Sequence, residues 1–306
     1  MKRIVLIPLL IAAMPVFAQE KKDKEPASVE IFSSQKAINA NTTELVAPGK
    51  MEFKITHNFG DFAGKFGGMK NFFGLDQATD VRFAFEFGLS KHIDVTLARA
   101  RGTDAGRQQR QFEFGLKWKM MDQKENDPSH PIAVSLFTNF VIASNTASTT
   151  PNLDNSYQDF GDRTSETVQL IIARKFGKVS FQLNPTIVNR GYAVSYDQET
   201  FFAMGGALRL PLSNRFNLIV DYFHPFRRQS VKDSFAVRPT PVHFYDPLGV
   251  GLEILTGRHV FHLNFTNATE ILENRFIPRT TTSWGKGQFR WGFTVSRQFN
   301  IAKPKK

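Results

Sequence analysis

Charged side chains recur at alternate positions of many short segments in this chain of 306 residues. Alternate residues of an extended segment point to the same face of a sheet. By this count the polar faces carry seven basic and seven acidic side chains. The basic ones are Lys54, Arg82, Lys117, Lys119, Lys175, Arg209 and Arg290. The acidic ones are Glu52, Asp80, Glu86, Asp94, Glu113, Asp221 and Glu253.

The equal numbers of these fourteen residues limit the chemistry that they can perform. A strongly ion-selective pore would be lined by one sign of charge. A balanced set instead predicts ion pairs that link neighbouring segments. Two interpretations remain open, an interior filled by the long Arg and Lys side chains and a narrow passage for small solutes.

Residues for catalysis or metal binding are poorly placed. A lipase-type site needs a serine, a histidine and a carboxylate or amide close together. His57 is the best-placed histidine, on the outward face between Ile55 and Phe59, but no serine can be assigned beside it. His259 and His262 fall on opposite faces of one strand, so they cannot share a metal. The chain has no cysteine, hence no disulfide or thiolate site. We expect no enzymatic activity, no cofactor and no nucleic-acid partner.

The polar positions lie within period-two segments that alternate with apolar residues. Val81, Phe83 and Phe85, for example, oppose Asp80 and Arg82. Twelve such segments are predicted, near 50–59, 79–89, 93–98, 112–120, 131–144, 168–172, 179–187, 202–210, 216–222, 248–254, 261–265 and 289–299. The middle segments are noisier, because Phe137 and Val141 break the alternation.

The connections between these segments alternate in length. The long ones are 60–78, 102–108, 145–164, 188–199, 224–243 and 267–286. The short ones are 90–92, 122–130, 176–178, 211–214 and 256–257. Long extracellular loops and short periplasmic turns alternate in this way in outer-membrane barrels. We therefore predict an all-β protein, a transmembrane antiparallel up-and-down β-barrel of about 12 strands, with both termini periplasmic.

A secreted β-sandwich is the soluble alternative, since it would bury the same apolar faces against a second sheet. The predicted strands are long for a soluble protein, where about 5–6 residues is typical. The mean hydropathy is −0.28, which a membrane barrel also shows because its strands alternate. Phenylalanine, with 31 copies, together with Trp118, Trp291 and Tyr222 predicts lipid-facing bands. A ligand-stacking platform is the alternative role for these aromatics.

The N-terminus predicts a signal peptide over residues 1–18. Lys2 and Arg3 precede an apolar stretch from Ile4 to Ala13, and Ala18 ends a small-residue cleavage site. A membrane anchor helix is the alternative, but the apolar stretch is short. Residues 19–49 are polar and without a clear period, and are predicted to be a periplasmic segment. The barrel is predicted over 50–300 and a basic tail over 301–306. This order predicts export to the outer membrane of a Gram-negative bacterium.

Several stretches carry a family resemblance. Residues 38–50 read INANTTELVAPGK and lead into MEFKITHNFGD at 51–61, and later come FFGLD at 72–76 and FEFGL at 85–89. These stretches resemble a Bacteroidota family of membrane-bound β-barrel proteins, domain of unknown function 5777, from about residue 30 to the end. The family commonly has His-Arg-Phe-Gly where this chain has His57-Asn58-Phe59-Gly60, so any role of that arginine is in doubt. The resemblance implies a barrel and a Bacteroidota source, and it implies no activity.

The net charge of +11 must arise largely outside the balanced polar faces. Arg99, Arg101, Arg227 and Arg228 lie near the outer ends of strands or in long loops. Arginine is well suited to phosphate, so these residues predict contact with lipopolysaccharide. A solvated loop surface is the alternative.

The expected partners are outer-membrane lipids and the barrel assembly machinery. Phe299 lies close to the position of the terminal aromatic residue that this machinery recognises. No protein partner is assigned.

The function predicted from the sequence is that of a narrow porin-like channel for small solutes. A structural or interaction barrel with a filled lumen and working extracellular loops is the rival prediction. An outer-membrane enzyme is a distant third. An open path through the barrel favours the first, and a continuous plug of side chains argues against it.

Overall fold

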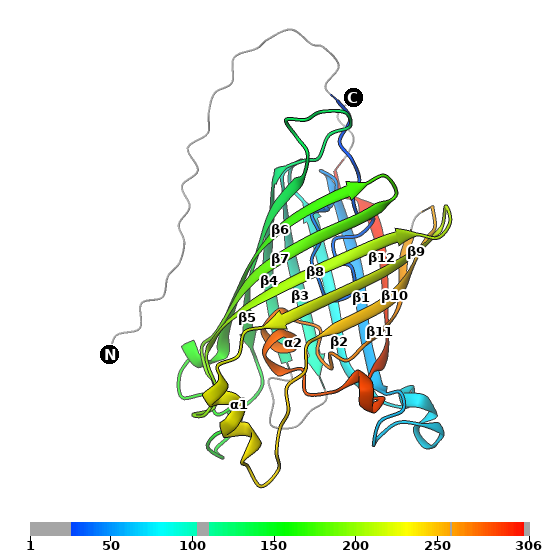
Figure 1. The fold of residues 1–306 in the computed structure, drawn as a ribbon. Helices are drawn as coiled ribbons and strands as arrows, with labels where there is room; N and C mark the ends of the chain where they lie inside the picture. The colour runs from blue at the N-terminus through cyan, green and yellow to red at the C-terminus, as the bar shows by residue number, and fades with distance from the viewer. Residues whose placement is uncertain (1–25, 103–109, 258, 303–306) are drawn as a thin grey trace.

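The period-two segments form the strands of one closed barrel. The computed structural model describes residues 26–102, 110–257 and 259–302, and twelve strands of this part of the chain close an antiparallel ring. Each strand pairs with its neighbours in sequence, and β1 closes the ring against β12 (Figure 1). The predicted twelve-stranded antiparallel barrel is therefore confirmed. The strands are β1 (Lys50–Asp61), β2 (Ala78–Gly88), β3 (Ile93–Gly102), β4 (Arg110–Met121), β5 (Ala133–Ala143), β6 (Thr164–Phe176), β7 (Val179–Arg190), β8 (Thr200–Pro211), β9 (Phe216–Pro225), β10 (Leu248–Leu255), β11 (His259–Thr266) and β12 (Arg290–Asn300).

The predicted signal peptide, its cleavage at Ala18 and the tail from residue 303 lie outside the described residues. Short helices lie in the long connections. They are η1 (Met69–Gly74), η2 (Gly161–Arg163), α1 (Gln229–Ala236), α2 (Glu273–Arg279) and η3 (Trp284–Lys286). Within the described ranges, none of the helices has both the length and the apolar character needed to cross a membrane.

The two faces of the barrel wall reverse the usual distribution of side chains in a soluble protein. Outward Phe83 and Phe112 are 42% and 44% exposed, whereas inward Lys54 and Glu113 are each only 1% exposed. A strand of a membrane barrel has lipid on its outer face and the lumen on its inner face, so it requires apolar side chains outside and polar side chains inside. The outward band therefore faces the hydrocarbon, and the charged residues line the lumen.

The two ends of the barrel differ. One end of the barrel carries the short turns, the start of β1 and the end of β12. We call it the terminal end. The long connections lie at the other, the loop end, where Figure 1 shows α1 and the cyan loop after β1. This sorting follows from the alternation of loop lengths, because consecutive antiparallel strands place every second connection at the same end.

Several apolar side chains point inward, on the strands where the alternation was noisy. The fully or nearly fully buried ones on the wall are Phe137, Val141, Ile171, Val188, Phe201, Ile219 and Phe223. An apolar side chain in a water-filled lumen would be exposed to water, and these are not. Two segments that are not part of the wall cover them inside the barrel.

Candidate functional site in the lumen

The first of these segments is the N-terminal strap, residues 30–46. Apolar Ile31 and Phe32 and polar Asn39 and Thr42 of the strap are all buried. Figure 1 shows this blue segment inside the barrel at the terminal end. The prediction that residues 19–49 form a periplasmic segment is therefore wrong for the strap. The strap has no regular alternation of apolar and polar residues, because wall side chains surround it on all sides and no single face has to be apolar.

The strap folds back on itself inside the lumen. Lys36 and Asn41 form an isolated antiparallel bridge, and the Ala37 N–H donates to the Ala40 carbonyl at 2.9 Å. The Thr42 N–H donates to the Gln35 carbonyl at 2.9 Å. The chain thus enters from the terminal end, turns at residues 37–40 and returns to the terminal end, where β1 begins.

One wall carboxylate holds the tip of this turn. Asp221 on β9 accepts three consecutive backbone N–H groups at Oδ2, from Ile38 at 3.0 Å, Asn39 at 2.5 Å and Ala40 at 2.8 Å. Its Oδ1 accepts a fourth hydrogen bond, from Asn39 Nδ2 at 3.0 Å. Hydrogen bonds to an ionised acceptor are about twice as strong as neutral ones. We call this arrangement the Asp221 clip.

The rest of the strap is held by polar wall side chains on both of its arms. Asn41 presents its carbonyl to Gln182 Nε2 at 2.7 Å and to Asn184 Nδ2 at 2.9 Å. Gln35 accepts from Lys54 Nζ at 3.0 Å through its side chain and from Lys117 Nζ at 3.1 Å through its carbonyl. The wall facing the strap is thus built of hydrogen-bonding side chains rather than apolar ones.

The second segment is the inserted loop, residues 267–283, which connects β11 and β12 and enters from the loop end. Its α2 is buried along nearly its whole length. The Ile271 N–H donates to Asp80 Oδ2 on β2 at 2.8 Å, and the Ala268 carbonyl accepts from Asn58 Nδ2 on β1 at 3.4 Å. Arg275 pairs with Glu270 at 2.9 Å inside the loop itself. The wall therefore anchors this segment through polar groups as well.

The strap and the inserted loop meet at Glu273. Its Oε1 accepts from Lys36 Nζ at 2.5 Å and from Asn41 Nδ2 at 3.0 Å, and its Oε2 accepts from Asn139 Nδ2 on β5 at 3.2 Å. Burial by itself would raise the pKa of Glu273, but the Lys36 ammonium, together with a backbone hydrogen bond and the Arg82 charge, holds the pKa below its ordinary value. The Glu273 carboxyl is therefore ionised at neutral pH. A chain of contacts now crosses the lumen, from β9 through the strap and α2 to β5.

An apolar cluster completes the filling. Ile31 and Phe32 of the strap and Phe276 and Ile277 of α2 belong to one buried cluster. The wall members of this cluster are Ala133, Ala173, Val188, Phe201, Ala203, Ala207 and Phe223. The Phe223 and Phe276 rings pack edge to face with centroids 5.2 Å apart. Three of the inward apolar residues of the wall, Val188, Phe201 and Phe223, are thus explained by the segments with which they cluster.

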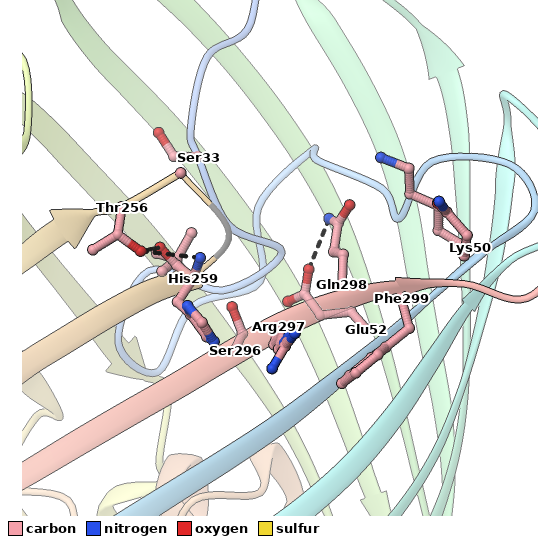
Figure 2. A pocket seen from close by; sticks show the side chains of 12 residues that line it. Ser33, Lys50, Glu52, Thr256, His259, Ser296, Arg297, Gln298 and Phe299 are labelled. Atoms are coloured by element: carbon pink, nitrogen blue, oxygen red, sulfur yellow. Dashed lines mark hydrogen bonds between the residues drawn. The ribbon is translucent and has the colours of Figure 1, made fainter.

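A polar pocket of about 610 Å³ opens beside the strap at the terminal end. Figure 2 shows Glu52 and Gln298 facing each other in it, with a hydrogen bond of 2.9 Å between them. Strap residue Ser33 lines one side of the pocket, and Lys50 at the start of β1 lines another.

The structure places the fourteen predicted lumen residues as follows. Twelve are buried in the barrel interior: Glu52, Lys54, Asp80, Arg82, Glu86, Asp94, Glu113, Lys117, Arg209, Asp221, Glu253 and Arg290. Lys119 and Lys175 lie less deeply, near the terminal end. Lys119 pairs with Asp122 at 3.0 Å, and Lys175 Nζ donates to the carbonyl of Glu30 at 3.1 Å.

The expected ion pairs across the wall form only in part. Arg82 pairs with Glu113 at 2.7 Å, and Arg209 pairs with Glu253 at 2.9 Å. Lys54 lies between Glu52 and Glu86, at 3.2 and 2.9 Å. In contrast, Asp80, Asp94 and Asp221 accept backbone N–H groups of the inserted loop or the strap. The acidic half of the set thus includes anchors for the two segments.

The sequence analysis missed the site residues that are not on strands. Lys36, Asn39 and Asn41 lie in a segment without period, and Glu273 lies in a connection that reads as an ordinary long loop. The available signals were weak. They are the apolar residues at inward positions of β5 and the family resemblance, which begins at about residue 30, before the first strand.

The four arginines predicted to contact lipopolysaccharide separate into different environments. Arg99 and Arg101 lie on the outward face of β3 near the loop end. The Arg227 side chain is only 3% exposed and pairs with Asp197 at 2.5 Å beneath the Phe244 ring. The prediction of lipid contact is therefore wrong for Arg227, because a buried and paired guanidinium is not available to a lipid. Arg228 is exposed beside a smaller pocket of about 340 Å³.

The histidines occupy the positions expected from the alternation. The His57 ring packs against Phe59 and Phe293 at centroid distances of 4.3 and 5.6 Å, on the outward face. His262 points inward and contacts Glu253 at 3.3 Å, whereas His259 lies on the other face. Among the residues that the structure describes, no three His, Cys, Asp or Glu side chains gather as a metal site would require.

The fold and the polar lumen define a membrane-bound β-barrel of the outer-membrane type. The family model of membrane bound beta barrel domains, DUF5777, matches residues 32–299, and the chain belongs to this family. The match starts inside the strap, so the family unit includes part of the lumen filling. Comparison with curated protein sequences gives no match.

Solved structures with similar architecture are outer-membrane barrels. The COG4313 outer membrane channel from Pseudomonas putida F1 is 8% identical, with a TM-score of 0.51 over 84% of this chain and 98% of that one. The KdgM porin is 8% identical, with a TM-score of 0.45 over 82% and 99%. Outer membrane phospholipase A from Escherichia coli is 10% identical, with a TM-score of 0.42 over 87% and 98%. At 8% identity, the likeness to the COG4313 outer membrane channel is one of fold alone.

Proposed function

We propose that this protein is an outer-membrane channel for small polar solutes that is closed at rest by its N-terminal strap. The strap fills the lumen together with the inserted loop, and it is attached to the wall by its C-terminal end at β1. The Asp221 clip carries the proposal, because one carboxylate fastens the tip of the strap through four hydrogen bonds. Because the clip gathers four of the strap's contacts at one side chain, we expect a change at this point to weaken the closure.

The lining of the wall supports a lumen that can hold water once the strap leaves. The buried inward side chains of β5 to β7 include Ser135, Asn139, Thr167, Gln169, Ser180, Gln182, Asn184 and Thr186. Such neutral polar groups cost little to hydrate, whereas an apolar lining would resist water. The charges on the remaining wall are balanced, so we expect little preference between anions and cations.

A permanently closed barrel with working extracellular loops is the second candidate. The apolar cluster that joins Ile31 and Phe32 to Phe276 favours it, since exposing that cluster to water opposes release of the strap. The two candidates differ in one measurable property, the movement of the strap.

Substitution of the clip tests the proposal. Asp221→Asn keeps the size of the side chain but removes the charge that favours the three N–H groups. We expect closure to weaken by about 3 kcal/mol, since hydrogen bonds to charged groups contribute about 1.5–3 kcal/mol each. This corresponds to a rise of about 100-fold in the ratio of open to closed channels. Single-channel recording in planar bilayers measures that ratio directly.

Glu113→Gln is the matched control. Glu113 is an equally buried wall carboxylate, but its hydrogen bonds go to Arg82 and Asn139 rather than to the strap. We expect this variant to stay as closed as the wild type. Equal opening in both variants would mean that general loosening of the wall, rather than the clip, controls the current, and no opening in correctly folded Asp221→Asn would favour the permanently closed barrel.

We further propose the location and processing that the sequence predicts. The chain is exported by a signal peptide over residues 1–18, and its terminal end faces the periplasm of a Gram-negative, Bacteroidota-type cell. The positive start, the short apolar stretch and Ala18 support this. N-terminal sequencing of the membrane-inserted protein should begin at Gln19; a chain that still begins at Met1 would contradict it.

We propose no catalytic activity, since His57 packs between two phenylalanine rings.

A further inference from the structure

Three arginines form a cluster on the lipid-facing surface at the loop end. Arg101 on β3 lies directly opposite Arg110 on β4, and Arg99 lies opposite Phe112 one step nearer the terminal end. All three side chains point outward, because Arg99 and Arg101 alternate with buried Ala100 and Arg110 alternates with buried Gln111. The sheet register brings the three arginines together at one edge of the wall.

The cluster is a concentration of like charge without a carboxylate among the described residues. Like charges placed directly opposite in a sheet destabilise the pair of strands. The contacts of Arg99 are a hydrogen bond to Ser144 Oγ at 3.0 Å and the face of the Phe112 ring, 4.1 Å from the guanidinium carbon. Neither of these neutral groups compensates the charge. An external anion would do so.

The depth of the cluster identifies the kind of anion. On these two strands, every outward residue between the cluster and the terminal end is apolar, from Leu97 to Ile93 on β3 and from Phe112 to Met120 on β4. The guanidinium groups therefore lie at the edge of the apolar band, at the level where lipid headgroups meet the hydrocarbon. Guanidinium groups bind phosphate in a bidentate manner, which a neutral headgroup cannot match.

We propose that Arg99, Arg101 and Arg110 form a binding site for the phosphate groups of a phosphorylated glycolipid of the outer leaflet, such as the lipid A part of lipopolysaccharide. The phosphates neutralise the opposed Arg101 and Arg110, and the acyl chains lie along the apolar band beneath. The site is independent of the lumen, so it stands whether or not the strap moves.

Lipid A with two phosphate groups is the probe. Purified full-length protein in detergent micelles is titrated with it, and native mass spectrometry follows the ratio of bound to free protein. We expect the triple variant Arg99→Gln, Arg101→Gln, Arg110→Gln to bind about tenfold more weakly or worse, since each charge-assisted contact is strong. The Arg→Lys triple variant should bind more weakly than the wild type but more tightly than the Gln variant, because an ammonium keeps the charge and loses the bidentate contact. Dephosphorylated lipid A should bind the wild type no better than phosphorylated lipid A binds the Gln variant.

The matched control removes the same charge at the other end of the barrel. Arg174, Arg215 and Arg297 lie on or next to strands near the terminal end. Their Arg→Gln triple variant should bind like the wild type. Equal loss in both triple variants, or displacement of lipid A by equimolar inorganic phosphate, would overturn the proposal. If the Gln triple variant does not fold, single Arg101→Gln must already weaken binding, and wild-type affinity there would equally overturn it.

Discussion

Deleting residues 26–46 between the signal peptide and β1 is expected to turn a channel that is almost always closed into one that conducts steadily. Several charge-assisted hydrogen bonds hold the strap, enough to keep the open fraction below about 1%. Removing it should therefore raise the mean current about 100-fold in planar bilayers. The wall should survive, because the strands from Lys50 onward pair with one another and not with the strap.

Adding the strap back as a separate molecule provides the control for this deletion. A synthetic peptide of residues 26–48, supplied on the terminal side, should block the current of the deleted protein. A peptide of the same composition in scrambled order should not. The inserted loop still narrows the loop end, so the deleted protein should pass small ions and exclude large sugars. A deleted protein that folds and remains silent would show that the wall and the inserted loop close the lumen by themselves, and the channel proposal would then be wrong.

Glu273→Ala is expected to lower the free energy of unfolding by about 3–5 kcal/mol, the usual cost of removing one partner of a buried ion pair. The substitution leaves the Lys36 ammonium buried without its anion, and it removes an acceptor from Asn41 and Asn139. Urea unfolding of protein refolded into lipid vesicles measures the change. Replacing both charges, as Lys36→Met with Glu273→Leu, should recover much of the loss, because an apolar pair of similar volume needs no counter-charge.

The acid dependence of this pair follows from the pKa of Glu273. Its pKa is depressed in the folded protein, so its contribution to stability is complete at neutral pH. That contribution is lost as the pH falls below the unfolded value of 4.5 and through the lower folded value. The double variant should lack this part of the acid sensitivity. If Glu273→Ala and the double variant are equally unstable, the carboxylate matters for its hydrogen bonds rather than for its pairing with Lys36.

The strand positions and the loop lengths were readable from the sequence because both are local properties. The β2 segment alternates without interruption, and its side chains fall inside and outside as counted. Each lumen charge could be assigned to a face in the same way. The alternation gives the face of a side chain but not its depth, so it does not separate Lys119 and Lys175 from residues that are far more buried.

The irregular strands were informative in a way that the sequence alone did not reveal. Phe137 and Val141 interrupt the alternation of the β5 segment, yet both point inward and are buried. Val141 belongs to a cluster with Leu272 of the inserted loop. An apolar residue at an inward position of a barrel strand therefore indicates something inside the barrel for it to contact.

The sequence by itself determined a twelve-stranded membrane barrel with a charge-balanced interior, because a two-residue repeat states which face each side chain takes. Only the tertiary structure decided that the interior is occupied. The contacts that occupy it join residues far apart in the chain, such as Asn39 with Asp221 and Lys36 with Glu273, separated by 182 and 237 positions. Neither the strap nor the inserted loop has a repeat, since each is surrounded by the wall rather than placed between water and lipid. Their position is therefore a property of the closed barrel and not of any one segment.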